Sequence, residues 1–407
     1  MKRAIAVLLL VPAFLFRGPV IQAGELEQQA FLHRHWPGAI EPQGQADGSL
    51  PTVEQSLKPS ACGSCHALQY QDWKTALHSK SMGPGIAGQL VEMVHQDPGS
   101  ATLCWSCHAP LAEQKQVIYS ESKGWVDNPV FDPDLQQHGM MCAACHVRER
   151  SVYGPQPRYE AAGLIDNDSP HNGFTADTAF SQSEFCKGCH QFNENDLSLN
   201  GKLIENTYNE WKESKYPAEG VQCQGCHMPD RRHLWRGIHD PETVKNGIDI
   251  DLKLSQESHV TGEIVTATIT ITNSGVGHHF PTYLTPKVFV KGQLVSREGY
   301  PLVESRQEYV IGRESYDLAE EAYDTRIPAG ERVQITYQYE LPARDLDLQV
   351  EIVVDPDHWY RRFYENYLEG GGGGRGRELL QEALQDSSES IFSIYDKKFA
   401  LDPGSGG

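Results

Sequence analysis

Five Cys-x-x-Cys-His motifs contain all ten cysteines of this 407-residue chain. Two thiols three residues apart on a helical turn lie on one face and can bond to the two vinyl groups of one haem. The histidine that follows then lies beneath the iron as its proximal ligand. The motifs therefore predict five covalently bound haem c groups. They are Cys62-Gly-Ser-Cys65-His66, Cys104-Trp-Ser-Cys107-His108, Cys142-Ala-Ala-Cys145-His146, Cys186-Lys-Gly-Cys189-His190 and Cys223-Gln-Gly-Cys226-His227.

Other uses of paired cysteines fit this pattern less well. A zinc site or a thioredoxin-like redox pair would not require a histidine after each of five pairs, and a disulfide would not require the two-residue gap. With all ten thiols used for haem, we expect no disulfides. Residues 60–240 number 181, which leaves 181/5 or about 36 residues for each motif. This is too little protein to insulate five haems from one another. We therefore expect the haems to lie close enough to exchange electrons.

The second axial position of each iron decides between electron transfer and catalysis. A low-spin carrier needs a second strong ligand on each iron, whereas a catalytic haem leaves that position open. Removing the five proximal residues from 17 histidines leaves 17 − 5 = 12. Seven of these are our candidate distal ligands, and the other five, at positions 33, 35, 95, 259 and 358, are expected at the surface. The candidates are His78, His138, His171, His233, His239, His278 and His279.

Longer stretches around the motifs resemble the exported multihaem cytochromes c. They run from Trp73 to His78, from His138 into the third motif, and from Glu210 into the fifth. More narrowly, they are similar to the lineage of tetrahaem cytochrome c-554, pentahaem nitrite reductase and octahaem hydroxylamine oxidoreductase-like proteins. The resemblance covers about residues 60–240 and implies a chain of mainly bis-histidine haems. The chain has no Cys-x-x-Cys-Lys, the motif of the open haem in most pentahaem nitrite reductases, which argues against nitrite reduction.

The beginning of the chain has the pattern of a secretory signal peptide, predicted at residues 1–23. A basic start, Met1-Lys2-Arg3, precedes a 13-residue apolar stretch, and small residues lead to a cleavage point after Ala23. The stretch is shorter than the roughly 18 residues that span a bilayer. We expect a mature chain that is exported to the periplasm or outside the cell and has no integral membrane segment.

The remaining patterns divide the chain into elements that would position the motifs. We expect an extended N-terminal arm at 24–59 and a mainly α and irregular multihaem cytochrome c domain at 60–240. Alternating apolar and polar residues then predict an all-β sandwich-like domain at 248–356. A helix and a flexible tail should follow at 357–407, after the glycines at 370–374. The loop at 275–281 carries two histidines that could reach a haem of the first domain or of another subunit.

The net charge of the chain indicates which kinds of partner it can bind. Lysine and arginine total 35, and aspartate and glutamate total 55, so the net charge is 35 − 55 = −20. This balance excludes nucleic acid as an expected partner, because phosphate binding needs a basic surface. We expect an electron carrier that acts between other redox proteins rather than a substrate-converting enzyme. One alternative is an oxidoreductase with one open haem acting on a small nitrogen or sulfur compound. Another is a subunit that self-associates into a conductive extracellular filament.

Overall fold

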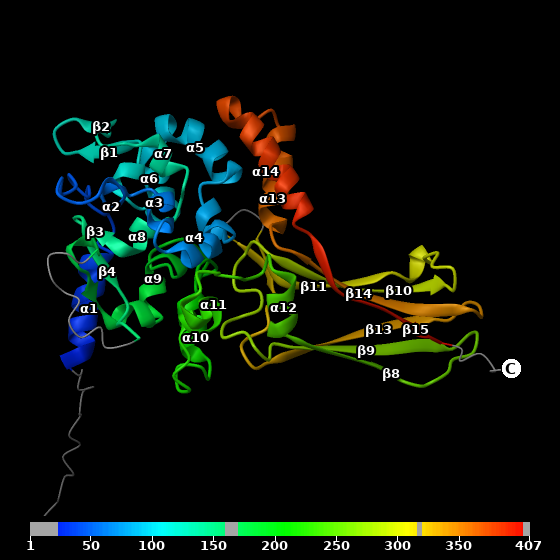
Figure 1. Ribbon diagram of the computed structural model, residues 1–407. Coiled ribbons are helices and arrows are strands. Elements are labelled where there is room, and N and C mark those ends of the chain that lie inside the picture. Colours follow the sequence, from blue (N-terminus) through cyan, green and yellow to red (C-terminus); the bar gives the residue numbers. More distant parts are fainter. Residues whose placement is uncertain (1–22, 159–169, 316–319, 402–407) are drawn as a thin grey trace, which may run out of the picture.

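The computed structural model describes residues 23–158, 170–315 and 320–401, in a helical part followed by a two-sheet part (Figure 1). Residues 1–22 of the predicted signal peptide lie outside these ranges. None of the described helices is long and apolar enough to cross a bilayer. The helices of the first part are α1 (Ala23–His35), α2 (Thr52–Gln55), α3 (Pro59–Gly63), α4 (Ala67–Lys74), α5 (Pro84–Gln96), α6 (Pro98–His108), α7 (Pro133–Gln136), α8 (Cys142–His146), α9 (Glu184–His190), α10 (Thr207–Glu213), α11 (Cys223–His227) and α12 (Pro241–Gly247).

The Cys-x-x-Cys-His motifs lie on helical turns, as their spacing predicts. Helices α6, α8, α9 and α11 each end at the histidine of a motif. In the first motif, α3 ends at Gly63, but the N–H of His66 still donates to the Cys62 carbonyl at 2.9 Å, which continues the turn. Short strands connect these helices: β1 (Val117–Ser120), β2 (Gly124–Asp127), β3 (Val147–Arg148), β4 (Ser151–Gly154), β5 (Thr175–Ala176), β6 (Ser198–Leu199) and β7 (Lys202–Leu203).

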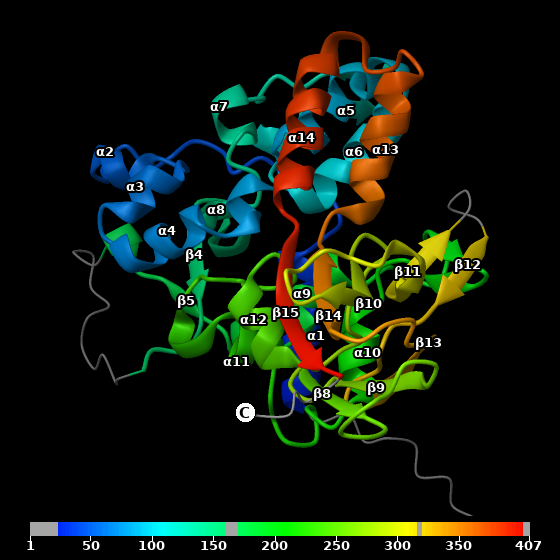
Figure 2. The ribbon, with the colours of Figure 1, turned by 90° about the vertical axis from the view of Figure 1, so that its right-hand side faces the viewer.

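Two antiparallel sheets form the second part, where the alternating pattern predicted strands (Figure 2). One sheet has the order β12-β11-β10-β14-β15 and the other β13-β9-β8. Alternate side chains of β9 in one sheet, and of β10 and β14 in the other, point into the space between the sheets and form one core. The strands are β8 (Asp249–Leu254), β9 (Ile264–Thr272), β10 (Lys287–Ser296), β11 (Gln307–Ser315), β12 (Glu321–Asp324), β13 (Arg332–Glu340), β14 (Leu346–Asp355) and β15 (Phe392–Ala400).

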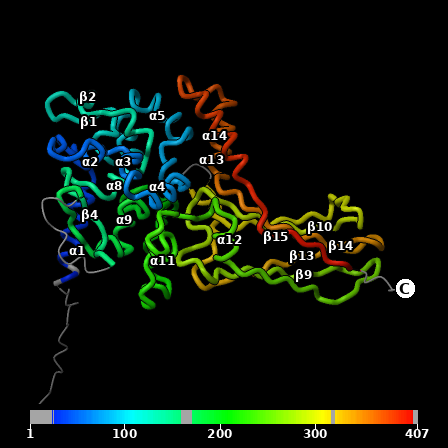
Figure 3. The backbone as a smooth tube through the Cα atoms, viewed as in Figure 1, coloured from blue at the N-terminus to red at the C-terminus, as the bar shows by residue number. Residues whose placement is uncertain are grey.

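The C-terminal segment differs from the predicted helix and flexible tail. Two helices, α13 (His358–Glu369) and α14 (Arg377–Glu389), form a hairpin that packs on α5, and the chain then returns to the sheet as β15 (Figure 3). The glycines at 370–374 make the turn of this hairpin. A register shift opposite Ile352 and Val353 interrupts the alternation of β15, which explains why a search for period two misses this strand. Residues 402–407 of the predicted tail lie outside the described ranges.

The extended arm expected at 24–59 is wrong for its first third, where α1 is a 13-residue helix. The segment contains helix formers such as Glu, Leu, Gln and Ala without an internal Gly or Pro after Gly24. Its apolar residues are not spaced along one face, so periodicity gives no signal. Phe31 is nevertheless buried and packs near Tyr153 and Phe180. Tertiary contacts with the third motif region therefore position this helix.

Buried polar contacts attach the two-sheet part to the helical part. The fully buried Arg313 of β11 donates to the carbonyl oxygens of Lys202 (2.9 Å) and Leu203 (2.7 Å) in the β6–β7 hairpin. Its Nε also donates to Glu321 at 2.6 Å. A buried guanidinium with several acceptors is costly to displace, because each acceptor would lose its partner. The two parts thus share a fixed boundary.

Candidate functional site

One cavity of about 2510 Å³ is lined by histidines from all five motifs and by residues of the two-sheet part. A pocket for a single small molecule has a volume of roughly 300–1,000 Å³. The cavity therefore has room for several large groups rather than for one ligand. The apolar clusters of the helical part are correspondingly small, because many of its apolar side chains line the cavity.

Four of the five motif histidines are oriented by hydrogen bonds at Nδ1. Three bond to backbone carbonyl oxygens, which only accept, so Nδ1 carries the proton and Nε2 keeps its lone pair for a metal. A fourth, His190, has its Nδ1 2.6 Å from the Tyr283 hydroxyl. The three carbonyl contacts are His108 to Ser81 (2.7 Å), His146 to Tyr153 (2.8 Å) and His227 to Arg236 (2.8 Å).

Three motif histidines each face a predicted distal histidine at nearly the same distance. Two metal–nitrogen bonds of about 2 Å each, plus roughly 1 Å from nitrogen to ring centre at each end, separate the ring centres of two trans imidazoles by about 6 Å. The observed separations agree with that value. They are 6.2 Å for His146 and His233, 6.2 Å for His78 and His190, and 6.3 Å for His227 and His278, whose planes differ by only 8°.

Each pair offers two ligands, and the rest of the metal's coordination must come from another source. No group of three or more His, Cys, Asp or Glu side chains in the described ranges is arranged to hold a bare metal ion. The four in-plane nitrogens of a porphyrin would complete such a site, with the thiols of the motif at its edge. The donor set, the cavity volume and the thiols therefore all fit haem c.

Burial keeps these histidines neutral, which is the form that binds a metal. Desolvation lowers the pKa of His78 to about 3, and it lowers the pKa values of His146, His190 and His278 to about 4. The Nδ1 atoms of His233 and His278 are also held by backbone carbonyl oxygens, at 3.0 Å and 2.9 Å. His233 and His278 therefore resemble the motif histidines in the way they present Nε2.

The other four candidates are not at this spacing from a motif histidine. His138 lies outside the cavity lining, with its ring against Trp73. Three line the cavity, each with a ring nitrogen beside a carboxylate: His171 Nδ1 lies 3.5 Å from Glu54, His239 Nε2 3.0 Å from Asp357, and His279 Nδ1 3.3 Å from Glu210. Within the described ranges, His66 and His108 face no histidine ring at the 6 Å spacing.

Two of the five histidines expected at the surface are buried. His35 is 2% exposed and His259 is 3% exposed. The ring of His35 donates through Nε2 to the Cys145 carbonyl at 2.8 Å, so α1 contacts the third motif directly. No pattern in the sequence indicates this contact, because α1 has no periodic apolar face. His33 and His95 are exposed as expected, and His358 is half-buried beside Asp355 at 2.9 Å.

Thiols of different motifs approach one another and show which motifs are neighbours. The thiols of Cys62 and Cys142, of Cys107 and Cys189, and of Cys186 and Cys223 lie close enough to shift each other's pKa. The first motif thus adjoins the third, the second adjoins the fourth, and the fourth adjoins the fifth. The thiol of Cys145 in the third motif also lies near those of the fourth. All five motifs are therefore connected through neighbouring motifs.

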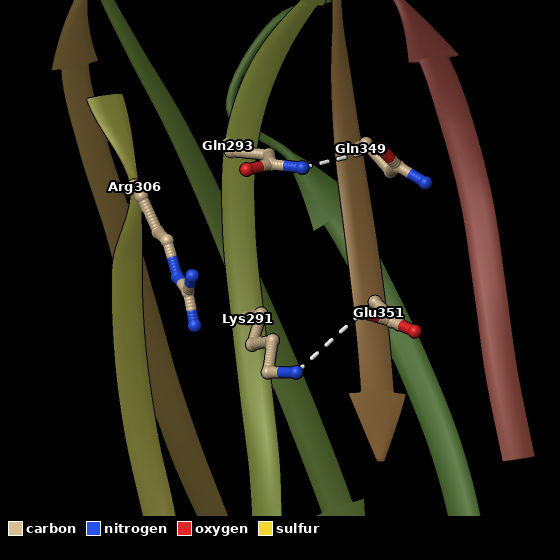
Figure 4. A pocket seen from close by; sticks show the side chains of 5 residues that line it. All are labelled: Lys291, Gln293, Arg306, Gln349 and Glu351. Atoms are coloured by element: carbon tan, nitrogen blue, oxygen red, sulfur yellow. Dashed lines mark hydrogen bonds and ion pairs between the residues drawn. The ribbon is translucent and has the colours of Figure 1, made fainter. Parts of the chain in front are cut away.

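A second, much smaller depression lies on the outer face of the five-stranded sheet (Figure 4). Its volume is about 100 Å³, below the roughly 300 Å³ of small-molecule pockets. Its polar side chains pair across neighbouring strands, as Lys291 does with Glu351 at 3.7 Å. We assign it no functional role.

Comparisons with known proteins agree with the geometry. The family model described as "Cytochrome c554 and c-prime" matches residues 61–128 and 141–228. The "Cytochrome c-type protein TorY" of Haemophilus influenzae is 24% identical over 190 residues, which are 44% of this chain and 38% of that protein. The chain thus spans less than two fifths of that relative. The fold is similar to that of a penta-heme cytochrome c552 from Thermochromatium tepidum, with a TM-score of 0.59, 19% identity, and coverage of 85% of this chain and 99% of the other.

Proposed function

We propose that the chain is a multihaem c-type cytochrome and that it carries electrons along five covalently attached haems between redox partner proteins. The observation that carries the proposal is the cavity onto which all five motifs converge, with three histidine pairs at one spacing. Each haem supplies a one-electron iron couple when bound. The chain supplies the ligands, the separation between haems and the surroundings that set the potentials.

We assign the ligands by motif. The two cysteines of each motif would form the thioethers, and His66, His108, His146, His190 and His227 would be proximal. His233 would complete the third site, His78 the fourth and His278 the fifth, because each ring lies opposite the proximal ring. His138 and His171 remain candidates for the first site. His171 is tied to Glu54 of α2, which packs beside α3 of that motif.

The order of the motifs in space supports electron transfer. Motifs whose thiols lie close together would place their haems in adjacent positions. The third motif lies between the first and the fourth, and the second and the fifth both adjoin the fourth, so no site is isolated. The net charge of −20 favours partners with basic patches and makes their association sensitive to salt. We also infer that the two sheets form a β-sandwich, and that residues 1–23 direct export to the periplasm or beyond.

A haem assay and a redox titration test the main proposal. The purified holoprotein should contain five haems per chain, and its reduced spectrum should show mainly low-spin bands. A Cys142→Ser, Cys145→Ser double variant should contain four haems, because it removes both attachment points of one motif. Finding fewer than five haems in the unmodified chain, from a host that attaches haem c, would refute the assignment. N-terminal sequencing of the exported protein tests cleavage after Ala23.

A second candidate function is catalysis at the second motif. No histidine ring lies at ligand spacing from His108 in the described part of the chain, and the α13–α14 hairpin covers this region. Tyr360 of α13 lies near Cys104, and burial raises the pKa of its hydroxyl to about 12. Such a site would have an open iron position beside phenol groups. Carbon monoxide binding to the reduced protein should then involve the haem of the second motif, and a protein that binds none excludes this function. The filament alternative has no support from either relative.

A further inference from the structure

The fourth motif differs from the others in the partner of its histidine. Nδ1 of His190 contacts the Tyr283 hydroxyl at 2.6 Å, and the two rings are nearly parallel, with centres 6.4 Å apart. In the three facing pairs, every other histidine whose Nδ1 is hydrogen bonded uses a backbone carbonyl oxygen. A side-chain substitution cannot remove that acceptor, whereas it can remove the Tyr283 hydroxyl. Tyr283 belongs to the two-sheet part, so a residue outside the haem domain contacts the histidine of the fourth motif.

A series of hydroxyl groups continues from Tyr283. Its hydroxyl interacts with that of Thr207 on α10. The hydroxyl of Thr207 lies 2.9 Å from that of Thr282, and Thr282 donates to a Glu210 carboxylate oxygen at 2.6 Å. The series therefore crosses three times between the helical part and the two-sheet part on its way from Tyr283 to a carboxylate.

Counting protons fixes the direction of every hydrogen bond in this series. Thr282 has one hydroxyl proton and gives it to Glu210, so Thr207 must donate to Thr282. By the same reasoning Tyr283 must donate to Thr207, and the Nδ1–H of His190 must donate to Tyr283. The direction leaves Nε2 of His190 without a proton, as iron binding requires.

The carboxylate at the end of the series is buried and paired. The Glu210 side chain is 1% exposed, and its Oε1 lies 2.9 Å from Nη1 of Arg326. The backbone N–H of His279 also donates to it at 3.1 Å. Glu210 thus lies between a guanidinium and a backbone N–H donor at the end of the series. A fixed negative charge polarises a chain of aligned hydrogen bonds, so that each acceptor in the chain becomes stronger.

We propose that the series Tyr283–Thr207–Thr282–Glu210 strengthens electron donation by His190 and so lowers the reduction potential of the haem at the fourth motif. A stronger acceptor at Nδ1–H makes the imidazole a more basic ligand, and a more basic ligand favours the oxidised iron. Tyr283, Thr282 and Glu210 are positioning residues that act through His190. The inference rests on the proposed role of His190 and His78 as the axial ligands of that haem.

Spectroelectrochemistry of the holoprotein tests the proposal. Tyr283→Phe should raise the reduction potential of one haem by about 59 mV, which corresponds to a tenfold change in its one-electron reduction equilibrium. Thr282→Val should raise the potential of the same haem by less, because it interrupts the series before Glu210 but keeps the Tyr283 hydroxyl that contacts His190. The effects of the two substitutions should not add, because both act through one series. Tyr337→Phe makes the same atomic change in the core of the two-sheet part and should shift no haem.

A ligand variant separates failure of this inference from failure of the proposed function. His78→Ala should make one haem high-spin, and that haem should be the one whose potential shifts in Tyr283→Phe. If His78→Ala leaves all haems low-spin, the ligand assignment is wrong. If His78→Ala acts as expected but Thr282→Val and Tyr283→Phe match Tyr337→Phe, the series has no effect on potential and the inference is refuted. Should Tyr283→Phe lose haem, the sign of the Thr282→Val shift decides.

Discussion

Replacing His278 with alanine should change the spin state of one haem, whereas the same change at the next residue should not. His278 and His279 are adjacent in one loop and both line the cavity. Only His278 faces a motif histidine, with its ring centre 6.3 Å from that of His227 and the planes 8° apart. If the spacing reports two imidazoles on one iron, His278→Ala removes a ligand and His279→Ala does not.

The size of the effect follows from the number of motifs. If each of the five motifs carries a low-spin haem, loss of one sixth ligand should lower the integrated low-spin ferric EPR signal by one haem in five, about 20%. The reduced variant should bind one carbon monoxide more per chain than the unmodified protein. Because the substitution leaves a space beside the iron, added imidazole should restore the low-spin signal.

The lost hydrogen bond between His278 and the His279 carbonyl is a smaller effect. It is worth roughly 1 kcal/mol of stability, which changes folding but not the spin state of an iron. His279→Ala removes a side chain of the same size from the same loop and keeps the backbone N–H that binds Glu210. Equal spectra for the two variants, or a change in His279→Ala alone, would show that the ring spacing does not identify ligands.

Two further predictions concern stability. Burial lowers the pKa of His35 from an ordinary 6.5 to about 3, so the folded chain favours the neutral form of this side chain. Its contribution to stability is complete above pH 6.5 and is lost as the pH falls towards 3. At pH 5 the loss is about 2 kcal/mol. His35→Phe should therefore reduce the difference in unfolding free energy between pH 7.5 and pH 5, measured by urea denaturation, and an unchanged difference relative to exposed His33→Gln would contradict the assignment. Gly376→Ala should lower the unfolding free energy by about 1–3 kcal/mol, because its Cβ would collide with the backbone oxygen of Gly88 on α5. Gly48→Ala, where a Cβ meets nothing within 4 Å, should have no comparable effect.

The local features of this molecule could be predicted from the sequence. The Cys-x-x-Cys-His spacing fits one helical turn wherever it occurs, so the placement of the motifs on helices needed no long-range information. The alternation in β8, β9, β13 and β14 is similarly local, since each strand buries one face. Sequence and structure agree where a pattern of fewer than about ten residues determines the conformation.

Long-range features could not be predicted in this way. The sequence indicated that His233 and His239 were equally good candidates, but only His233 faces a motif histidine, whereas Asp357 of a distant segment accepts from His239. Burial of His35 depends on the packing of α1 against the third motif, about 110 residues later. The interrupted alternation of β15 can be recognised only against its partner, β14. In each case the deciding contact joins residues far apart in the chain.

The loop at 275–283 gives the two-sheet part a role that a purely structural or docking domain would not have. Its His278 faces the histidine of the fifth motif, and its Tyr283, five residues later, contacts the histidine of the fourth. Arg313 and Arg326 hold the same boundary through buried hydrogen bonds to the helical part. Because these contacts fix the loop relative to α9 and α11, a displacement of the sheets would alter two neighbouring proposed haem sites together. The two-sheet part is therefore better understood as a component of the proposed electron-transfer site than as an appendage to it.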